Sequence, residues 1–294
     1  RLFADYLERA LATGGREAVL PDAGTPLPAL ARRRPPVVVE RCAASSLAAA
    51  RGLGRRTAEF HLALASDRRD GAFAPIPMTT DYLRALADDC ARRAEQVVES
   101  LNANLAALPA SVASQAHELL SDSSALIGRF RGLDRLRTDA WRIRVHGDYH
   151  LGQVLHVAEN DFVLLDFEGE PLRTIGERRE KYSPLKDVAG MIRSFGYAAH
   201  SAFIEAVGRH PERIAVREPW VRAWETWVAA AFLGAYLESA GDSPIVPGEA
   251  DALQALLEAF LLDKAIYELG YELNHRPDWL PIPFEAIRSI AVKP

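Results

Sequence analysis

Hydrophobic residues recur at helical spacing through the first half of the chain, which is therefore predicted to be mainly helical. The pattern begins at once in Leu2–Leu11, and residues 21–36, rich in Pro, Gly and Arg, interrupt it without a period of their own. An amphipathic helix is predicted over 43–66, and a long helical region over 79–136 that Pro109 divides. The first half is therefore predicted to form packed helices. Gly52 and Gly54 lower the helix propensity in the middle of the predicted helix over 43–66.

The pattern changes after residue 141, where polar and apolar residues alternate. Residues 142–145, 154–157 and 162–166 predict three short strands, and Asn160–Asp161 predicts the turn between the last two. Helical spacing returns from Ser183 onward, where Ser-Pro is typical of a helix start. The predicted fold class is mainly α with a small β-hairpin region, an α+β arrangement.

Composition narrows the class of protein. The chain has 294 residues, 49% hydrophobic and 26% charged, which is typical of a globular protein. A net charge of -5 and the absence of basic clusters mixed with aromatics argue against nucleic acid as a partner. The longest apolar run, Val228–Leu237, is too short to cross a bilayer, so no membrane partner is expected. Two cysteines without metal spacing fit a reducing compartment, and the cytoplasm is the predicted location.

The candidate chemistry lies in His146–Gln153 and the strand that follows it, which ends in aspartate. In phosphoryl transfer to a hydroxyl group, a catalytic Asp precedes an amide that binds Mg²⁺ by five residues, and a second Asp binds the metal. Asp148, Gln153 and Asp166 occupy these positions in order. Asp148 is the predicted base, and Gln153 and Asp166 offer the hard oxygen ligands that Mg²⁺ prefers.

Two other interpretations concern this region. His146, Asp148 and His150 could form a metal cluster of a hydrolase, but Gln153 and Asp166 would then have no role. His146 is predicted to brace the catalytic loop. Asp187, one turn into the helix after Ser183, is predicted as structural support, whether it favours the helix N-terminus or holds the catalytic loop.

Several blocks of sequence resemble a known family. The string HGDYHLGQ at 146–153, followed by a strand ending in Asp166, resembles the aminoglycoside-phosphotransferase-like branch of the protein-kinase-like superfamily. The more particular resemblance is to bacterial maltokinases. It rests on the following blocks: Val145–Leu155, Leu165–Pro171, Glu177–Arg179, Ser183–Ser194, Leu53–His61 and Leu262–Asn274.

The resemblance implies that ATP and Mg²⁺ are used to phosphorylate maltose at its anomeric hydroxyl, giving maltose 1-phosphate for glycogen synthesis. It also implies a possible fusion to trehalose synthase. By the same resemblance His150 and Glu168 flank the acceptor sugar. The remaining predicted sugar contacts are Arg193, Lys264, Tyr267, Glu268 and Tyr271.

Four of these contacts also share a helical face by spacing. Lys264, Tyr267, Glu268 and Tyr271 recur at intervals of three and four residues. Polar groups can bind sugar hydroxyls, and aromatic rings can cover the apolar side of a pyranose. Without the resemblance, the same stripe would be a solvated helix surface.

The resemblance divides the chain into a lead-in helix and connector (1–40), a helical part of a kinase C-terminal lobe (41–137), and a catalytic part (138–294). No glycine-rich phosphate loop is visible, and Val37–Val39 is the one early strand-like run. We therefore expect the N-terminal ATP-grasping lobe to be absent and to be supplied as a covalent or separate partner. The isolated chain would then be weakly active or inactive.

Two other functions fit the same residues. One is another small-molecule kinase of this fold, acting on a different sugar, an amino alcohol or an aminoglycoside. The other is a catalytically silent sugar-binding or docking lobe of a trehalose synthase fusion. The presence of Asp148, Gln153 and Asp166 favours an enzyme, since a structural lobe has no need for oxygen ligands at these positions.

Overall fold

A computed structural model describes most of the chain and divides it into two compact units. The described residues are 2–12, 20–22, 24–158, 161–170, 173–209 and 214–291. Unit 1 consists of Arg1–Ile76 and Arg142–Val246, and unit 2 consists of Pro77–Trp141 and Pro247–Pro294. Two crossings between units fall within the short strands β1 (Ile76–Pro77) and β2 (Trp141–Arg142). The predicted segments 1–40, 41–137 and 138–294 divide the chain elsewhere and remain predictions.

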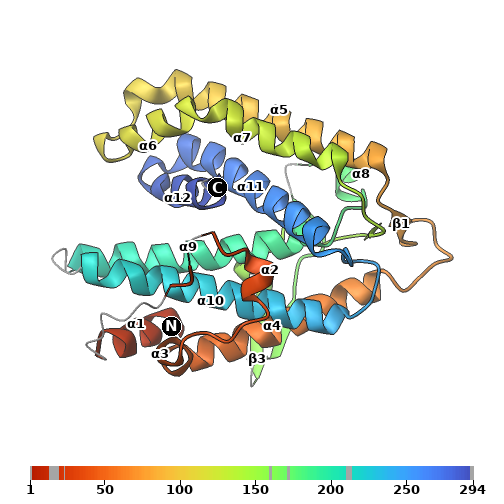
Figure 1. The fold of residues 1–294 in the computed structure, drawn as a ribbon, viewed down its shortest axis with the longest axis horizontal. Coiled ribbons are helices and arrows are strands. Elements are labelled where there is room, and N and C mark those ends of the chain that lie inside the picture. Colours follow the sequence, from red (N-terminus) through yellow and green to blue (C-terminus); the bar gives the residue numbers. More distant parts are fainter. Residues whose placement is uncertain are drawn as a thin grey trace. The chain divides into compact units, whose positions relative to one another are not determined.

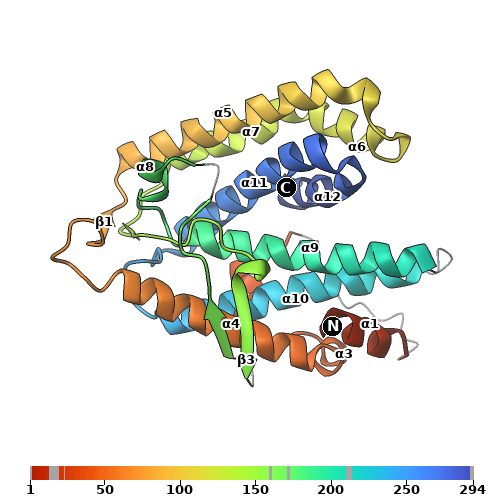
Figure 2. The same ribbon diagram turned by 180° about the vertical axis from the view of Figure 1, so that it is seen from behind.

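Unit 1 is built mainly from helices, with one β-hairpin (Figures 1 and 2). Its described elements are α1 (Leu2–Ala12), α2 (Leu27–Leu30), α3 (Val37–Cys42), α4 (Ala44–Leu64), η3 (Leu151–Gln153), β3 (Val154–Ala158), β4 (Asp161–Leu164), α8 (Ile175–Arg178), α9 (Leu185–Arg209) and α10 (Ile214–Ala240). Helices α4, α9 and α10 run beside one another, and the hairpin lies along α4 (Figure 2).

The packing of α4 against α10 explains a glycine in the middle of a helix. A Cβ atom on Gly54 would lie 2.3 Å from the carbonyl oxygen of Phe232, so only glycine permits this approach of the two backbones. The cost of glycine in a helix is offset by the burial of neighbours such as Leu53 and Phe232, which are 2% and 0% exposed. The predicted helix over 43–66 is therefore confirmed as α4.

Two predictions about the first half are wrong in detail. Val37–Val39 reads as a strand because β-branched residues favour strands, yet it begins α3. Pro36 precedes it with extended backbone, and Val39 is fully buried, so tertiary packing outweighs local preference. The connector over 21–36 contains α2, which begins after Pro26.

The β-hairpin was predicted closely. Strands β3 and β4 pair antiparallel, with Val154 opposite Leu164 and His156 opposite Phe162. The predicted strand over 142–145 is much shorter, since only β2 and an isolated bridge between Ile143 and Tyr182 form there. The predicted turn at Asn160 lies outside the described residues. The mainly helical α+β class is confirmed.

Unit 2 is formed by helices that surround α11. Its elements are α5 (Thr80–Asn104), η1 (Leu105–Ala107), α6 (Ala110–Ser121), α7 (Ser123–Arg131), η2 (Gly132–Arg135), α11 (Ala250–His275), η5 (Pro277–Trp279) and α12 (Pro281–Ala291). The Thr79 hydroxyl caps α5 by accepting a hydrogen bond from the Tyr82 amide, as the sequence predicts. Arg93 joins α5 to α11 through two hydrogen bonds to Asp263, of 2.9 and 2.8 Å.

No helix in the described part of the chain is both long enough and apolar enough to cross a lipid bilayer. The expected cytoplasmic location remains a prediction.

Candidate active site

The hairpin of unit 1 brings the two predicted metal ligands together. The ladder continues beyond β3 and β4 through a 2.9 Å hydrogen bond from the Leu165 amide to the Gln153 carbonyl. Gln153 and Asp166 therefore leave the hairpin side by side, and the Gln153 amide lies 3.3 Å from an Asp166 carboxylate oxygen. The two residues are 13 positions apart in the sequence, and ordinary strand pairing brings them together.

Asp166 has an unusual backbone. Its φ of 59° makes it the one non-glycine residue with positive φ in the described chain. Aspartate tolerates this left-handed conformation better than most residues, but it still costs energy, and such positions are concentrated at functional sites. The conformation ends the strand and turns the chain sharply at an exposed carboxylate.

Asp148 and His150 lie in the loop before η3. The His150 Nε2 atom is 3.9 Å from the Asp148 carboxylate, and both side chains are partly exposed. The Gly152 amide donates to His150 Nδ1 at 3.0 Å, so this ring nitrogen acts as acceptor and the proton lies on Nε2, which faces Asp148. A Cβ atom on residue 152 would meet the His150 ring at 2.7 Å, which explains the glycine there.

A buried carboxylate holds the start of this loop. Asp187 is 1% exposed and accepts hydrogen bonds from the His146 and Gly147 amides, at 2.6 and 3.0 Å. Burial by itself raises the pKa of Asp187, but the hydrogen bonds from His61 and Gly147 and the nearby imidazoles outweigh burial, and the pKa falls below its ordinary value. Asp187 therefore supports the loop as an anion.

Two further buried groups complete this network. His61 Nε2 lies 3.1 Å from Asp187, and its Nδ1 lies 3.1 Å from the Tyr236 hydroxyl. Burial raises the pKa of Tyr236 well above its usual range, so the phenol stays protonated. The chain of contacts from Tyr236 through His61 to Asp187 connects α10, α4 and α9 to the catalytic loop.

His146 is buried and contacts the backbone just before Asp166; its predicted role as a brace of the loop remains a prediction. It is 1% exposed, and its Nε2 donates to the Leu165 carbonyl at 2.7 Å. The contact joins His146, in the catalytic loop, to Leu165, which directly precedes Asp166. Phe60 and Phe167 stack on each other at 5.3 Å, and both rings lie edge-on to His146.

Helix α9 approaches the loop at two points. A Cβ atom on Gly190 would lie 2.6 Å from the Tyr149 carbonyl oxygen, so a larger residue would push α9 away. The Ser194 hydroxyl accepts a hydrogen bond of 3.2 Å from the Leu151 amide. The Tyr149 hydroxyl is 2.8 Å from that of Thr57, on α4. The loop is thus fixed from both sides of Asp148.

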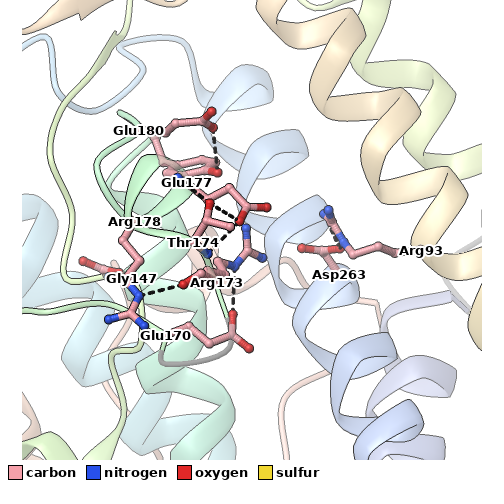
Figure 3. A network of polar contacts seen from close by, with 11 residues as sticks. Arg93, Gly147, Glu170, Arg173, Thr174, Glu177, Arg178, Glu180 and Asp263 are labelled. Carbon is pink, nitrogen blue, oxygen red and sulfur yellow. Dashed lines mark hydrogen bonds and ion pairs between the residues drawn. The ribbon is translucent and has the colours of Figure 1, made fainter.

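The segment after Asp166 forms a second ordered network, drawn in Figure 3. The capping box of α8 is complete: Glu177 accepts from the Thr174 amide at 2.8 Å, and the Thr174 hydroxyl accepts from the Glu177 amide at 3.3 Å. Arg173 donates to Glu170 at 2.8 Å, and Arg178 donates to the Arg173 carbonyl at 2.9 Å. These local contacts give the segment a defined shape.

The predicted sugar contacts are divided between the two units. Glu168, in unit 1, is exposed two residues beyond Asp166, whereas Arg193, on α9 of the same unit, is only 5% exposed. His150, also in unit 1, lies 3.9 Å from Asp148, and the remaining four residues lie on α11 of unit 2.

On α11 the predicted stripe is partly exposed. The Lys264 ammonium lies 4.6 Å from the centre of the Tyr267 ring, and Tyr271 stacks on His275 at 4.3 Å. Tyr267 and Tyr271 are 37% and 43% exposed, but Glu268 is only 8% exposed. The stripe is therefore an exposed aromatic edge with a buried carboxylate beside it.

Sequence reasoning missed the residues that hold the loop. His61, Tyr236, Tyr149 and Ser194 have no role assigned from the sequence, because each acts through a partner far along the chain. A buried polar residue on an apolar helix face was the available signal for His61, within Ala58–His61 of α4. No pattern in the sequence pairs it with Asp187.

The side chains available as ligands restrict how a metal ion could bind. Among the described residues, no group of three or more His, Cys, Asp or Glu side chains could hold a metal ion alone. This argues against the alternative of a hydrolase cluster built on His146, Asp148 and His150, since His146 faces Leu165 instead. Gln153 and Asp166 fit Mg²⁺, which commonly takes few protein ligands and fills its other positions with phosphate oxygens and water.

Known proteins that are similar in sequence to this chain include two glucosamine kinases. The chain is 28% identical over 233 residues to a glucosamine kinase of Streptacidiphilus jiangxiensis, covering 79% of this chain and 46% of that protein. It is 30% identical over 148 residues to the glucosamine kinase of Mycolicibacterium smegmatis, covering 49% of this chain and 33% of that protein. The chain thus spans about half the length, or less, of these relatives. No protein-family model matches it.

Solved structures agree with this relationship. A glucosamine kinase in complex with glucosamine, ADP and inorganic phosphate shares the fold with a TM-score of 0.65 and 23% identity, over 97% of this chain and 58% of that one. Another glucosamine kinase structure, crystal form A, has a TM-score of 0.61 and 25% identity, over 80% of this chain and 51% of that one.

The predicted membership of the maltokinases is wrong, because the relatives found in both comparisons are glucosamine kinases. The wider assignment to an aminoglycoside-phosphotransferase-like lobe is withdrawn with it. Phosphoryl transfer needs the residues at 146–153 and 166 whatever the acceptor, so they do not specify a sugar. Maltose, glycogen synthesis and a trehalose synthase partner depended on the resemblance and are withdrawn too.

Proposed function

We propose that the chain forms part of an ATP-dependent sugar kinase, a phosphotransferase with an alcohol group as acceptor, and that the acceptor is an amino sugar of the glucosamine type. The observation that carries this proposal is the pairing of Gln153 with Asp166 at 3.3 Å at the end of the hairpin. The names of the relatives and the ligands of one solved neighbour support the substrate class.

Each residue of the site has a chemical role in this proposal. The Asp148 carboxylate, which is partly exposed, accepts the proton of the attacking hydroxyl. His150, whose Nε2–H faces Asp148, orients that carboxylate. Gln153 and Asp166 would hold Mg²⁺, which when bound neutralises charge on the phosphates of ATP.

Charge favours an amino sugar over a neutral one. Asp148, Asp166 and Glu168 place three carboxylates within 21 residues of chain that the hairpin folds together. The ammonium group of glucosamine is attracted by this negative charge, whereas glucose and maltose have no such group. Glu168, exposed beside Asp166, is the proposed partner of the ammonium.

Arg193 remains a proposed sugar contact of unit 1, and the α11 stripe of Lys264, Tyr267, Glu268 and Tyr271 remains a proposed sugar-binding surface of unit 2. The requirement for a further ATP-grasping lobe also remains a proposal. It fits the observation that the relatives are about twice as long as the matched part of this chain or longer.

The test compares four acceptors: glucosamine, N-acetylglucosamine, glucose and maltose. With the chain supplied with the ATP-grasping lobe, we expect ATP-dependent phosphorylation of glucosamine, detected by mass spectrometry of the product, and much weaker reaction with the other three. Glucose is the sharpest control, because it has a hydroxyl group where glucosamine has the ammonium group, whereas N-acetylglucosamine loses the charge and also gains an acetyl group. Equal rates with all four sugars, or preference for maltose, would contradict the proposed acceptor.

A Glu168→Gln variant tests the role of the ammonium group. It keeps the size of the side chain and removes its charge. We expect its KM for glucosamine to rise and its KM for glucose to stay unchanged. A parallel change for both sugars would show that Glu168 does not bind the ammonium.

A further inference from the structure

Gly147 of the catalytic loop lies close to Gly169, which in turn lies close to the side chain of Arg178. Gly147 and Gly169 have φ values of 86° and 79°, which glycine adopts without strain. A Cβ atom on Gly147 would lie 3.4 Å from the Gly169 Cα atom. A Cβ atom on Gly169 would lie 3.4 Å from both Cβ and Cγ of Arg178.

The Arg178 side chain is itself fixed. Its Nε donates to the Arg173 carbonyl at 2.9 Å, and Arg173 donates to Glu170 at 2.8 Å (Figure 3). The capping box of Thr174 and Glu177 holds the helix that carries Arg178. The aliphatic part of Arg178 is therefore a rigid surface behind Gly169.

The other side of the turn formed by residues 166–169 is held by rings. Phe167 stacks on Phe60 at 5.3 Å and contacts His146 edge-on at 5.8 Å. The turn is thus confined between this ring cluster and Arg178. Asp166 begins the turn, and Gly147 immediately precedes Asp148, so displacement of Gly169 would move both functional carboxylates.

We propose that Arg178 is a positioning residue of the active site. It acts through Gly169 and Gly147 to set the distance between Asp148 and Asp166. This inference rests on the proposed function, since it takes these two side chains as base and metal ligand. The aliphatic stem of Arg178 makes the contact, and its guanidinium fixes the stem.

Hydrogen exchange measured by mass spectrometry tests the contact without requiring activity. Arg178→Ala removes the stem beyond Cβ, and we expect faster exchange in peptides covering 145–150 and 165–170, with the rest of unit 1 unchanged. Arg178→Met retains an apolar stem and is expected to restore protection. Arg179→Ala is the matched control, because Arg179 is the exposed neighbour and its side chain makes no hydrogen bond or ion pair with another described residue.

Kinetics supply the second measurement. Misplacing the base relative to the acceptor lowers kcat, and we expect a loss of about tenfold in Arg178→Ala, with KM for ATP and glucosamine nearly unchanged and with recovery in Arg178→Met. If the Ala variant cannot be purified, Arg178→Ser, which likewise removes Cγ and Cδ, takes its place.

The outcomes separate the two proposals. If the chain, supplied with the ATP-grasping lobe, does not phosphorylate an amino sugar, the proposed function fails, while the exchange result still decides whether Arg178 holds the loop. If the wild type is active and the exchange and kcat of Arg178→Ala equal those of Arg179→Ala, the positioning role is wrong.

Discussion

The catalytic loop of unit 1 and the α11 stripe of unit 2 were both predicted from residue spacing, but the structure holds them by different means. Around the loop, Asp187, His61 and Tyr236 are each no more than 1% exposed and bond to one another and to the loop backbone. Along α11, Tyr267 and Tyr271 are more than a third exposed; the Lys264 ammonium lies over the Tyr267 ring, and Tyr271 stacks on His275.

This difference indicates a division between chemistry and recognition. A base and a metal ligand must be held within a fraction of an ångström, which favours buried, mutually satisfied polar contacts. Binding of a sugar ring tolerates small shifts, so exposed side chains with rotational freedom are sufficient. Substitutions around the loop should therefore have large effects, and substitutions on the stripe small ones.

The largest expected effect is that of Asp148→Asn. Removal of the base should lower kcat by about 10²- to 10⁴-fold while KM changes little. Steady-state kinetics with glucosamine and ATP provide the measurement. Asp88→Asn, an exposed aspartate on α5, is the matched control and should behave as the wild type. Retention of kcat in Asp148→Asn would show that Asp148 is not the catalytic base.

Asp187→Ala should cause the largest loss of stability. It leaves the His146 and Gly147 amides and His61 without their buried acceptor, and losing one partner of such a network costs about 3–5 kcal/mol in the free energy of unfolding. Urea denaturation measures the loss. Asp242→Ala, at an exposed turn of the same unit, should change little. Similar values for the two variants would mean that the network does not stabilise the loop.

The same carboxylate predicts a pH dependence. Its pKa is lower in the folded protein than in the unfolded chain, so it contributes stability at pH values above its ordinary pKa. That contribution is lost as pH falls through the lower, folded-state pKa. The free energy of unfolding should therefore decrease more steeply in acid for the wild type than for Asp187→Asn. Parallel curves would contradict the ionised state of Asp187.

How much of this was visible in the sequence differs between elements. The hairpin could be predicted because alternation sets which strand residues pair, and its end then fixes where Gln153 and Asp166 meet. The helical conformation of Val37–Val39 could not be predicted, because it depends on the burial of Val39 against distant residues. Local preference gives no information about such contacts.

The candidate site shows the same limit. Residue types at 148, 153 and 166 follow from the chemistry and could be found by spacing. His61 and Tyr236 stand 126 and 49 residues from Asp187, and nothing in the chain marks them as its partners before the helices pack. The acceptor sugar was also mispredicted, because the shared motif reports the reaction and not the sugar.

Tyr271→Ala tests the α11 stripe and should have a small effect on stability. The ring stacks on His275 but remains 43% exposed, so we expect the free energy of unfolding to fall by less than about 1 kcal/mol. Affinity for glucosamine, measured by titration calorimetry, should fall severalfold if the stripe binds sugar. Tyr271→Phe keeps the stacked ring and should retain most of the affinity. Unchanged affinity in Tyr271→Ala would mean that the stripe is a solvated helix surface and does not bind the sugar.

The smallest effect is expected at the ion pair between α4 and the hairpin. Arg56 donates to Asp161 at 2.6 and 3.1 Å, and this bond lowers the pKa of Asp161. Both side chains are nearly half exposed, so water and salt screen the pair, and holding two mobile side chains together costs entropy. A double-mutant cycle of Arg56→Ala and Asp161→Asn should therefore give a coupling energy close to the error of measurement. A clear coupling that persists in high salt would instead show that the hairpin, and with it the pairing of Gln153 and Asp166, depends on an exposed contact as much as on the buried network.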